Sequence, residues 1–394
     1  LYTIFGGMKS VLYTSVLQTP ILLLGSLIIL VLGFKELGGW DEMMRVCGAV
    51  TVNDYGDTMT NLIRSNDDAN FPWLGALIGS AIIGFWYWCT DQFIVQRVLS
   101  GKNEMEARRG TIFGAYLKLL PVFLFLIPGM IAFALHQKYI GAGGEGFLPM
   151  LANGTANADA AFPTLVAKLL PAGVKGLVVC GILAALMSSL ASLFNSSAML
   201  FTIDFYKRFR PETPEKKLVG IGQVATVVIV ILGILWIPIM RSVGDVLYTY
   251  LQDVQSVLAP GIAAAFLLGI CWKRTSAQGG MWGLISGMVI GLTRLGAKVY
   301  YSNAGEVADS TFKYLFYDMN WLFFCGWMFL FCIIVVIVVS LATKAPTAEK
   351  IQGLVFGTAT KEQKAATRTS WNHWDIIHTV IILAITAAFY WYFW

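Results

Sequence analysis

Apolar stretches of about 20 residues, each long enough to cross a bilayer as a helix, recur along this chain. Their apolar character is continuous, whereas the strands of a membrane barrel alternate over roughly ten residues. The pattern predicts about nine spanning helices, at residues 11–33, 72–95, 110–135, 174–205, 217–240, 245–271, 278–298, 320–343 and 374–393. The expected fold class is therefore an all-α polytopic membrane protein.

Prolines interrupt several of these apolar runs. Each proline removes a backbone hydrogen bond and favours a kink. The prolines concerned are Pro20, Pro121, Pro128, Pro238 and Pro260. Pro121 and Pro128 bracket the interior of the third predicted span, so a break is expected there.

Charged residues gather in the loops and predict an orientation. The segments after the second, fourth and eighth predicted spans are basic, whereas residues 36–68 are acidic. The positive-inside rule makes the basic loops cytoplasmic, so the first span runs from inside to outside and Trp394 lies outside. Residues 344–373 are expected to form a polar cytoplasmic linker with a short interfacial helix.

Composition supports a multi-pass protein of the cell membrane, in contact with the lipid bilayer. Hydrophobic residues make up 57% of the chain, and only 13% are charged, against roughly 25% in soluble domains. The net charge of +5 lies in separate loops without a tract suited to nucleic acid, so no nucleic-acid partner is expected. Because the chain begins with Leu1 and lacks a charged n-region with a cleavage site, we expect no signal peptide and expect a piece of a longer protein that starts just before a spanning helix.

The cysteines and histidines give no sign of disulfide or metal chemistry. Five of the six cysteines fall in apolar spans and only Cys47 is expected in a loop, so no disulfide framework can be drawn. The three histidines do not cluster with cysteines or acidic residues at metal-ligand spacing. No covalent reaction is indicated, and an enzyme is not expected.

Ser188 and Ser189 lie near the middle of the fourth predicted span, where a polar group needs a partner or a ligand. One interpretation is helix packing, because small residues recur at every fourth position and allow another helix to approach closely. They are Ala184, Ser188, Ser192 and Ser196. For Ser192 and Ser196 that alternative stays open. The other reading is that the Ala185 carbonyl and the hydroxyls of Ser188 and Ser189 supply hard oxygen ligands for a small cation, and sodium fits that chemistry.

Lys118 lies about eight residues, or roughly 12 Å, inside the cytoplasmic end of its predicted helix. A lysine at that depth is a functional candidate, with snorkelling to the interface as the alternative. Asp91 lies toward the cytoplasmic end of the preceding span and could pair with Lys118 or with Arg97. Either pair would be a structural or gating latch.

Gln252 lies roughly 10 Å from the outer end of its span, with Tyr248 one turn earlier on the same face. An amide beside an aromatic ring suits a polyhydroxylated ligand, and Tyr87 and Trp88 could add a second aromatic wall. The alternative is that these side chains fill polar gaps between helices.

With these residues in place, the chain resembles the solute:sodium symporter family, and within it the sodium/glucose cotransporter branch. The block Asp-Gln-Phe-Ile-Val-Gln-Arg at 91–97 is highly specific. The resemblance is carried by residues 1–7, 86–100, 116–121, 127–130, 186–192 and 265–274. It implies a single transporter domain over 1–394 with the leucine-transporter-type inverted-repeat fold. Residues 1–34 would be the last helix of the first repeat, 72–272 the second repeat and 278–394 trailing helices, with the first core helices missing.

The resemblance also implies site roles. Ala185, Ser188 and Ser189 look like sodium ligands, Lys118 and Gln252 look like sugar hydrogen-bonding residues, and Tyr87 looks like an inner aromatic gate with Trp88 beside it. The chain departs from the family at three positions. Ser15 stands where many relatives have Asp, Tyr248 where Phe is usual, and Gly84 where a polar residue often touches sugar.

These observations predict sodium-coupled symport of a small polyol by alternating access, with a hexose such as glucose or galactose favoured. The alternatives are myo-inositol or another small metabolite as cargo, or a membrane sugar sensor that does not transport. A redox-driven proton-pump subunit needs several ionisable residues in its spans, whereas Lys118 is expected to be nearly alone there. Relatives that carry two sodium ions have an Asp at the position of Ser15 and a Thr or Ser at that of Ala191, so one sodium per sugar is expected here.

Overall fold

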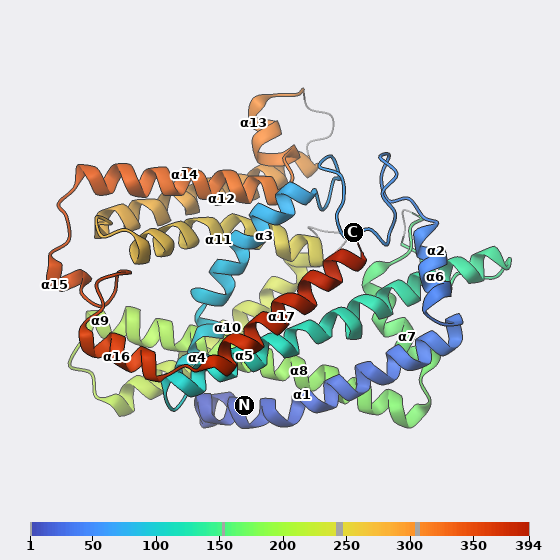
Figure 1. The fold of residues 1–394 in the computed structure, drawn as a ribbon, viewed down its shortest axis with the longest axis horizontal. Coiled ribbons are helices and arrows are strands. Elements are labelled where there is room, and N and C mark those ends of the chain that lie inside the picture. Colours follow the sequence, from blue (N-terminus) through green and yellow to red (C-terminus); the bar gives the residue numbers. More distant parts are fainter. Residues whose placement is uncertain (1, 152–153, 242–246, 304–307, 394) are drawn as a thin grey trace. The chain divides into compact units, whose positions relative to one another are not determined.

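The computed structural model describes residues 2–151, 154–241, 247–303 and 308–393 (Figure 1). Throughout these residues the regular structure is helical, and the extended pairings are isolated bridges, Thr51 with Thr58 and Met150 with Ala156. The chain forms two compact units that interleave in sequence. Unit 1 comprises Leu1–Thr60 and Phe113–Gly244, and unit 2 comprises Asn61–Ile112 and Asp245–Trp394.

Unit 1 contains the helices of four candidate membrane spans, Gln18–Leu37, most of Glu104–Gly141, Ala172–Phe209 and Glu215–Pro238, together with shorter helices. They are α1 (Tyr2–Leu37), α2 (Trp40–Gly48), the end of α5 (Glu104–Pro121), η1 (Val122–Leu126), α6 (Ile127–Gly141), η2 (Ala158–Ala160), α7 (Ala161–Leu169), α8 (Ala172–Met199), η3 (Leu200–Tyr206), α9 (Lys207–Phe209) and α10 (Glu215–Arg241).

Unit 2 contains the remaining helices. They are α3 (Trp73–Cys89), α4 (Gln92–Leu99), the start of α5, α11 (Leu247–Cys271), α12 (Ala277–Asn303), α13 (Thr311–Lys313), η4 (Tyr314–Asp318), α14 (Trp321–Ala342), α15 (Ala348–Ile351), α16 (Lys361–Thr369) and α17 (His373–Tyr392).

Glycines let α1 and α8 approach closely in unit 1, where the two helices run side by side (Figure 1). A Cβ added to Gly181 would lie 3.2 Å from the Cα of Leu22, and one added to Gly25 would lie 3.0 Å from a methyl of Val178. Small residues allow this approach between apolar helices that have no hydrophobic force to join them in lipid. Beside this crossing, α6 and α7 complete a core that includes Ile29, Ile131, Leu135 and Leu165.

The expected break in the third span is confirmed. Pro121 ends α5, the five residues of η1 form a π-helical segment, and Pro128 lies in the first turn of α6. Missing proline N–H groups and π-bulges are both causes of irregular helical geometry. A second break, a bend of 47° between α3 and α4, occurs without a proline.

Close glycine contacts also build unit 2. A Cβ at Gly287 of α12 would lie 3.0 Å from the Cα of Gly261 on α11 and 3.1 Å from the sulfur of Cys332 on α14. The three helices therefore pack as a tight bundle, and α3 joins them through Gly79, where an added Cβ would meet the backbone of Leu322 at 2.8 Å.

All nine predicted spans coincide with helices or with broken helices of the described chain. Seven described helices are long and apolar enough to cross a membrane, or eight when the bent pair α3–α4 counts as one span. The helix α12 is not among them. The expected linker contains α15 and α16. The orientation and the division into repeats stay predictions.

The expectation that Cys47 lies in a loop is wrong. It lies in the amphipathic helix α2, fully buried, and burial raises the pKa of its thiol to about 11. Residues 40–48 lie within the acidic stretch 36–68, and their helix is short and amphipathic, with Met43 and Cys47 on its buried side. All six cysteines are free thiols.

Candidate functional site

The serine pair lies on α8, and the structure adds a third hydroxyl beside it. Ser188 is half-buried and its Oγ lies 2.6 Å from the Oγ of Ser15 on α1. Ser189 is exposed on the surface of unit 1, and Ala185 is half-buried one turn before it. Hydroxyl and carbonyl oxygens are the ligands that hard cations prefer. The α1–α8 contact thus gathers oxygen atoms around Ser188, and the role of these residues as sodium ligands stays a prediction.

Packing accounts for the other serines of the same face. Ser192 and Ser196 are buried, and the Ser196 hydroxyl donates to the carbonyl of Leu193 in its own helix. Ala184 is buried as well. The helix-packing alternative therefore fits Ser192 and Ser196, whereas Ser188 meets a polar partner from another helix.

Tyr87 and Trp88 lie at the carboxyl end of α3, directly before the bend into α4. Their rings contact each other edge to face, with centroids 5.2 Å apart and an interplanar angle of 89°. Tyr87 is half-buried and Trp88 is half-exposed. A gating role for Tyr87 stays a prediction.

Gln252 lies in the first half of α11 and is half-buried. The side chain of Tyr248 lies outside the described residues, so the predicted amide–ring pair is not tested. At Gly84 on α3, an added Cβ would find no atom of the described chain within 4 Å. The missing polar group at this position therefore leaves open space.

Lys118 lies in α5, within the candidate span Glu104–Gly141, and its side chain is exposed on unit 1. Lys118 belongs to unit 1, whereas Tyr87, Trp88 and Gln252 belong to unit 2. Their assembly into one sugar site stays a prediction.

Asp91 caps the helix that follows the bend. Its carboxylate caps α4 by accepting a hydrogen bond from the backbone N–H of Phe93 at 3.1 Å. The Arg97 guanidinium lies over the ring of Phe93, 5.6 Å from the centroid. Capping of this kind satisfies a helix-end donor at a bend. The latch that pairs Asp91 with Arg97 or with Lys118 stays a prediction.

A charge cluster that the sequence interpretation missed lies one residue after Gln252. Asp253 of α11 pairs with Lys298 of α12 at 2.5 Å, and its other oxygen lies 3.5 Å from Nη2 of Arg294. Arg294 is fully buried. The expectation that Lys118 is nearly alone among ionisable residues of the spans is therefore wrong. Spacing could have flagged Arg294 and Lys298, which lie four residues apart in an otherwise apolar helix.

Backbone and aromatic contacts complete the surroundings of Arg294. Its Nη2 donates to the carbonyl of Met319 at 2.8 Å, and its guanidinium lies 4.0 Å from the centroid of the Phe324 ring. The cluster therefore ties α11, α12 and the start of α14 together around the turn that carries Gln252. Buried charges persist only where such partners compensate their lost hydration.

Among the described residues, no group of three or more His, Cys, Asp or Glu side chains could hold a metal ion together. The Ser15 and Ser188 hydroxyls hydrogen-bond each other, and a role for them in holding a small, hard cation stays a prediction.

Known proteins resemble the chain over nearly its whole length. The sodium/mannose cotransporter of Bos taurus is 34% identical over 414 residues, which cover 100% of this chain and 69% of the relative. The human sodium/myo-inositol cotransporter 2 is 36% identical, covering 91% of this chain and 54% of the relative. The sodium/glucose cotransporter 1 of Ovis aries is 38% identical, covering 87% of this chain and 54% of the relative. The chain thus spans about half the length of two of these relatives.

A solved structure shares the fold. It is the substrate-bound, outward-open state of a Na+-coupled sialic acid symporter, which matches with a TM-score of 0.62 and 20% identity over 88% of this chain and 65% of that one. The likeness confirms the expected all-helical, leucine-transporter-type fold. The model of the sodium:solute symporter family matches residues 1–287. The spanning helices, the specific block at 91–97 and these matches together show that the chain belongs to the sodium:solute symporter family.

Proposed function

We propose that this protein is a sodium-coupled symporter that moves a small polyol by alternating access, with a hexose such as glucose or galactose as cargo. The observation that carries the proposal is the hydrogen bond between the Ser15 and Ser188 hydroxyls, which joins two apolar helices by polar groups. A polar cluster in a spanning helix marks an ion or substrate pathway. The family and the relatives named for glucose, mannose and myo-inositol support a sodium-coupled cargo of this class.

Linkage between the ion and the sugar supplies the coupling. Sodium bound at Ala185, Ser188 and Ser189 favours the outward state that binds sugar, and its release inside weakens sugar binding by the same factor. In that scheme Lys118 and Gln252 hydrogen-bond the sugar hydroxyls, and Tyr87, Trp88 and Tyr248 cover the ring faces.

The test is uptake of labelled sugars into proteoliposomes that contain the full-length protein. An inward sodium gradient should drive accumulation, and an equal potassium gradient should not. Glucose, galactose, mannose and myo-inositol form the panel, and the highest ratio of maximal rate to half-saturating concentration identifies the cargo. A ratio for myo-inositol above the ratio for every hexose would overturn the hexose assignment.

A sensor is the alternative from another class. It would bind a sugar in a sodium-dependent way but give no accumulation in the same vesicles. Equilibrium binding measured beside uptake separates the two functions, because a symporter shows both and a sensor shows binding alone.

A further inference from the structure

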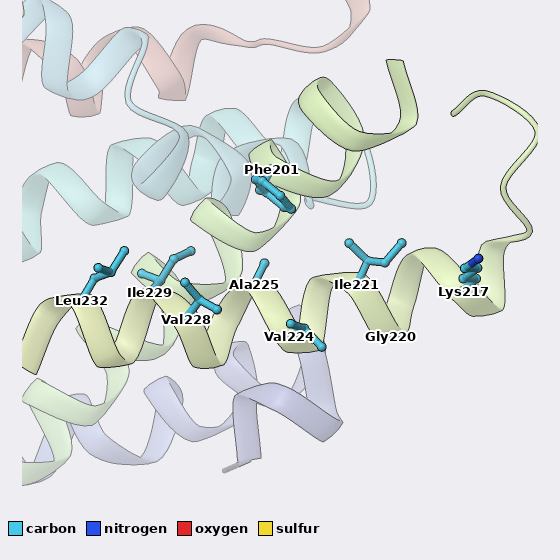
Figure 2. A pocket seen from close by; sticks show the side chains of 9 residues that line it. All are labelled: Phe201, Lys217, Gly220, Ile221, Val224, Ala225, Val228, Ile229 and Leu232. Atoms are coloured by element: carbon cyan, nitrogen blue, oxygen red, sulfur yellow. The ribbon is translucent and has the colours of Figure 1, made fainter. Parts of the chain in front are cut away.

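An apolar groove lies within unit 1 between η3 and α10. It has a volume of about 740 Å³, and Lys217 is the one charged residue that lines it. Figure 2 shows Phe201 reaching from η3 toward α10, with Lys217 and Leu232 at opposite ends of the row of lining residues. Val224 and Leu232 are 64% and 59% exposed, so the groove opens at the side of the helix.

The dimensions of the groove match one lipid chain. Leu232 lies fifteen residues after Lys217 on α10, so the lining row is roughly 22 Å long. One leaflet of a bilayer has a hydrocarbon depth of about 15 Å. Eight of the nine lining residues lie on α10, and Phe201 of η3 covers the groove from the other side. Both helical segments belong to candidate membrane spans, Ala172–Phe209 and Glu215–Pro238. The groove therefore faces the hydrocarbon and can cover the full length of one acyl chain.

Basic residues at one end of the groove indicate where the headgroup of a bound lipid would lie. Residues 207–217, which join the two walls, carry five basic residues and two acidic ones. Lys217 can lay its methylene stem along the apolar wall and keep its ammonium at the interface. The positive-inside rule predicts this connection to be cytoplasmic, on the side where anionic lipids are enriched. An apolar row that ends in a cationic group complements a lipid whose chain ends in a phosphate.

We propose that this groove is a binding site for one anionic phospholipid, with an acyl chain along α10 and the headgroup phosphate at Lys217. The site is independent of the transport proposal, because none of its residues belongs to the candidate sodium or sugar site.

Two pairs of variants separate the groove from its surroundings. Gly220 lines the groove and an added Cβ there meets nothing within 4 Å, so Gly220→Phe fills the groove without striking the backbone. Gly233→Phe is the matched control, because Gly233 lies on the same helix with the same free space and does not line the groove. Lys217→Gln removes the cation at the mouth, and Lys216→Gln removes an equal charge beside it.

Native mass spectrometry of the delipidated full-length protein measures the binding. The probes are phosphatidylglycerol and phosphatidylcholine of the same chain length. The parent and both control variants should bind one phosphatidylglycerol more tightly than phosphatidylcholine. Gly220→Phe should lose this adduct with both lipids. Lys217→Gln should weaken the affinity for phosphatidylglycerol about fivefold and leave the affinity for phosphatidylcholine unchanged.

Several results would overturn the proposal. They are a parent without preference for phosphatidylglycerol, an adduct that survives Gly220→Phe, and a preference that survives Lys217→Gln. If Gly220→Phe does not fold, the comparison of Lys217→Gln with Lys216→Gln still tests whether Lys217 binds the lipid headgroup, because both variants keep the groove intact.

Discussion

Ser189 tests the ion site at the level of a single side chain. Its hydroxyl is exposed on unit 1, so its loss should leave packing intact. If it ligates sodium, Ser189→Ala removes one of few oxygen ligands and should raise the sodium concentration for half-maximal uptake severalfold. The measurement is sodium-dependent sugar uptake in proteoliposomes.

Ser196→Ala is the matched control, because the hydroxyl of Ser196 bonds within its own helix. It should leave the sodium dependence as in the parent. Unchanged sodium dependence in the double variant of Ser188 and Ser189 to alanine would leave helix packing as the explanation.

Gln252 tests the sugar site. A lost hydrogen bond to a bound hydroxyl leaves a polar group unpaired, so Gln252→Ala should weaken sugar affinity by about 1–3 kcal/mol, or roughly ten- to a hundredfold. Gln255→Ala removes the same side chain one turn further along α11 and should bind sugar as the parent does. Equal affinities for the Gln252 variant and the parent, with transport merely slower, contradict the assignment.

Asp253 tests the charge cluster through stability. Asp253→Asn leaves Arg294 and Lys298 with no anionic partner among the described residues, and loss of one partner of a buried pair costs about 3–5 kcal/mol. We expect a lower midpoint of thermal unfolding in detergent. Asp309→Asn is the control, since the Asp309 side chain is 95% exposed in its pair with Lys313 and should show no measurable shift. Equal midpoints for both variants would show that the cluster is not stabilising.

At the scale of elements, the α1–α8 crossing depends on the absence of a side chain at Gly181. Gly181→Leu would push an isobutyl group against the backbone of Leu22, and overpacking of this kind costs about 1–3 kcal/mol. Gly176→Leu on the same helix meets open space and should be neutral or stabilising, because leucine is the better helix former. Thermal unfolding of the two purified variants compares them. A Gly181 variant as stable as the Gly176 variant would contradict close packing at this crossing.

Helix positions could be predicted from the sequence because a spanning helix needs a long apolar run, and the break at Pro121 and Pro128 because proline marks it. Other features left no such mark. The bend between α3 and α4 has no proline. The residue that marks it is the helix cap Asp91, and in the sequence an aspartate at this position is equally consistent with one partner of an ion pair. Helix α12 carries the cluster charges Arg294 and Lys298, which lower its hydropathy although it packs in the centre of unit 2.

At the scale of the whole molecule, contacts between distant segments are what the sequence could not supply. Ser15 and Ser188 lie 173 residues apart, and no local pattern joins them. Ser15 was interpreted as a lost carboxylate, and the structure shows it as a hydroxyl in contact with the candidate ion ligand. Spacing along one helix predicts shared faces within that helix, whereas partners from other helices depend on the fold.

This contact sharpens the expected stoichiometry of one sodium ion per sugar. A second ion needs ligands that replace almost all of its hydration, and a low-dielectric site makes anionic or several dipolar ligands necessary. Ala191 is buried and offers no side-chain oxygen, and Ser192 is fully buried. The neutral hydroxyl of Ser15 hydrogen-bonds Ser188, so we expect it to add to the predicted first sodium site and not to form a second one.

We therefore expect a Hill coefficient for sodium near one, and a reversal potential at which the sugar gradient balances the first power of the sodium gradient, including the membrane potential.

The double variant Ser15→Asp with Ala191→Ser places a carboxylate beside Ser188 and restores a hydroxyl at the second position. Because that carboxylate supplies the missing anionic ligand, the variant should raise the Hill coefficient above one and move the reversal potential toward the square of the sodium gradient. Ala191→Ser alone is the control and should stay near one. A parent protein whose sugar gradient already balances the square of the sodium gradient would show that a second ion finds its ligands elsewhere, and Ser15 and Ala191 would then not set the number of ions.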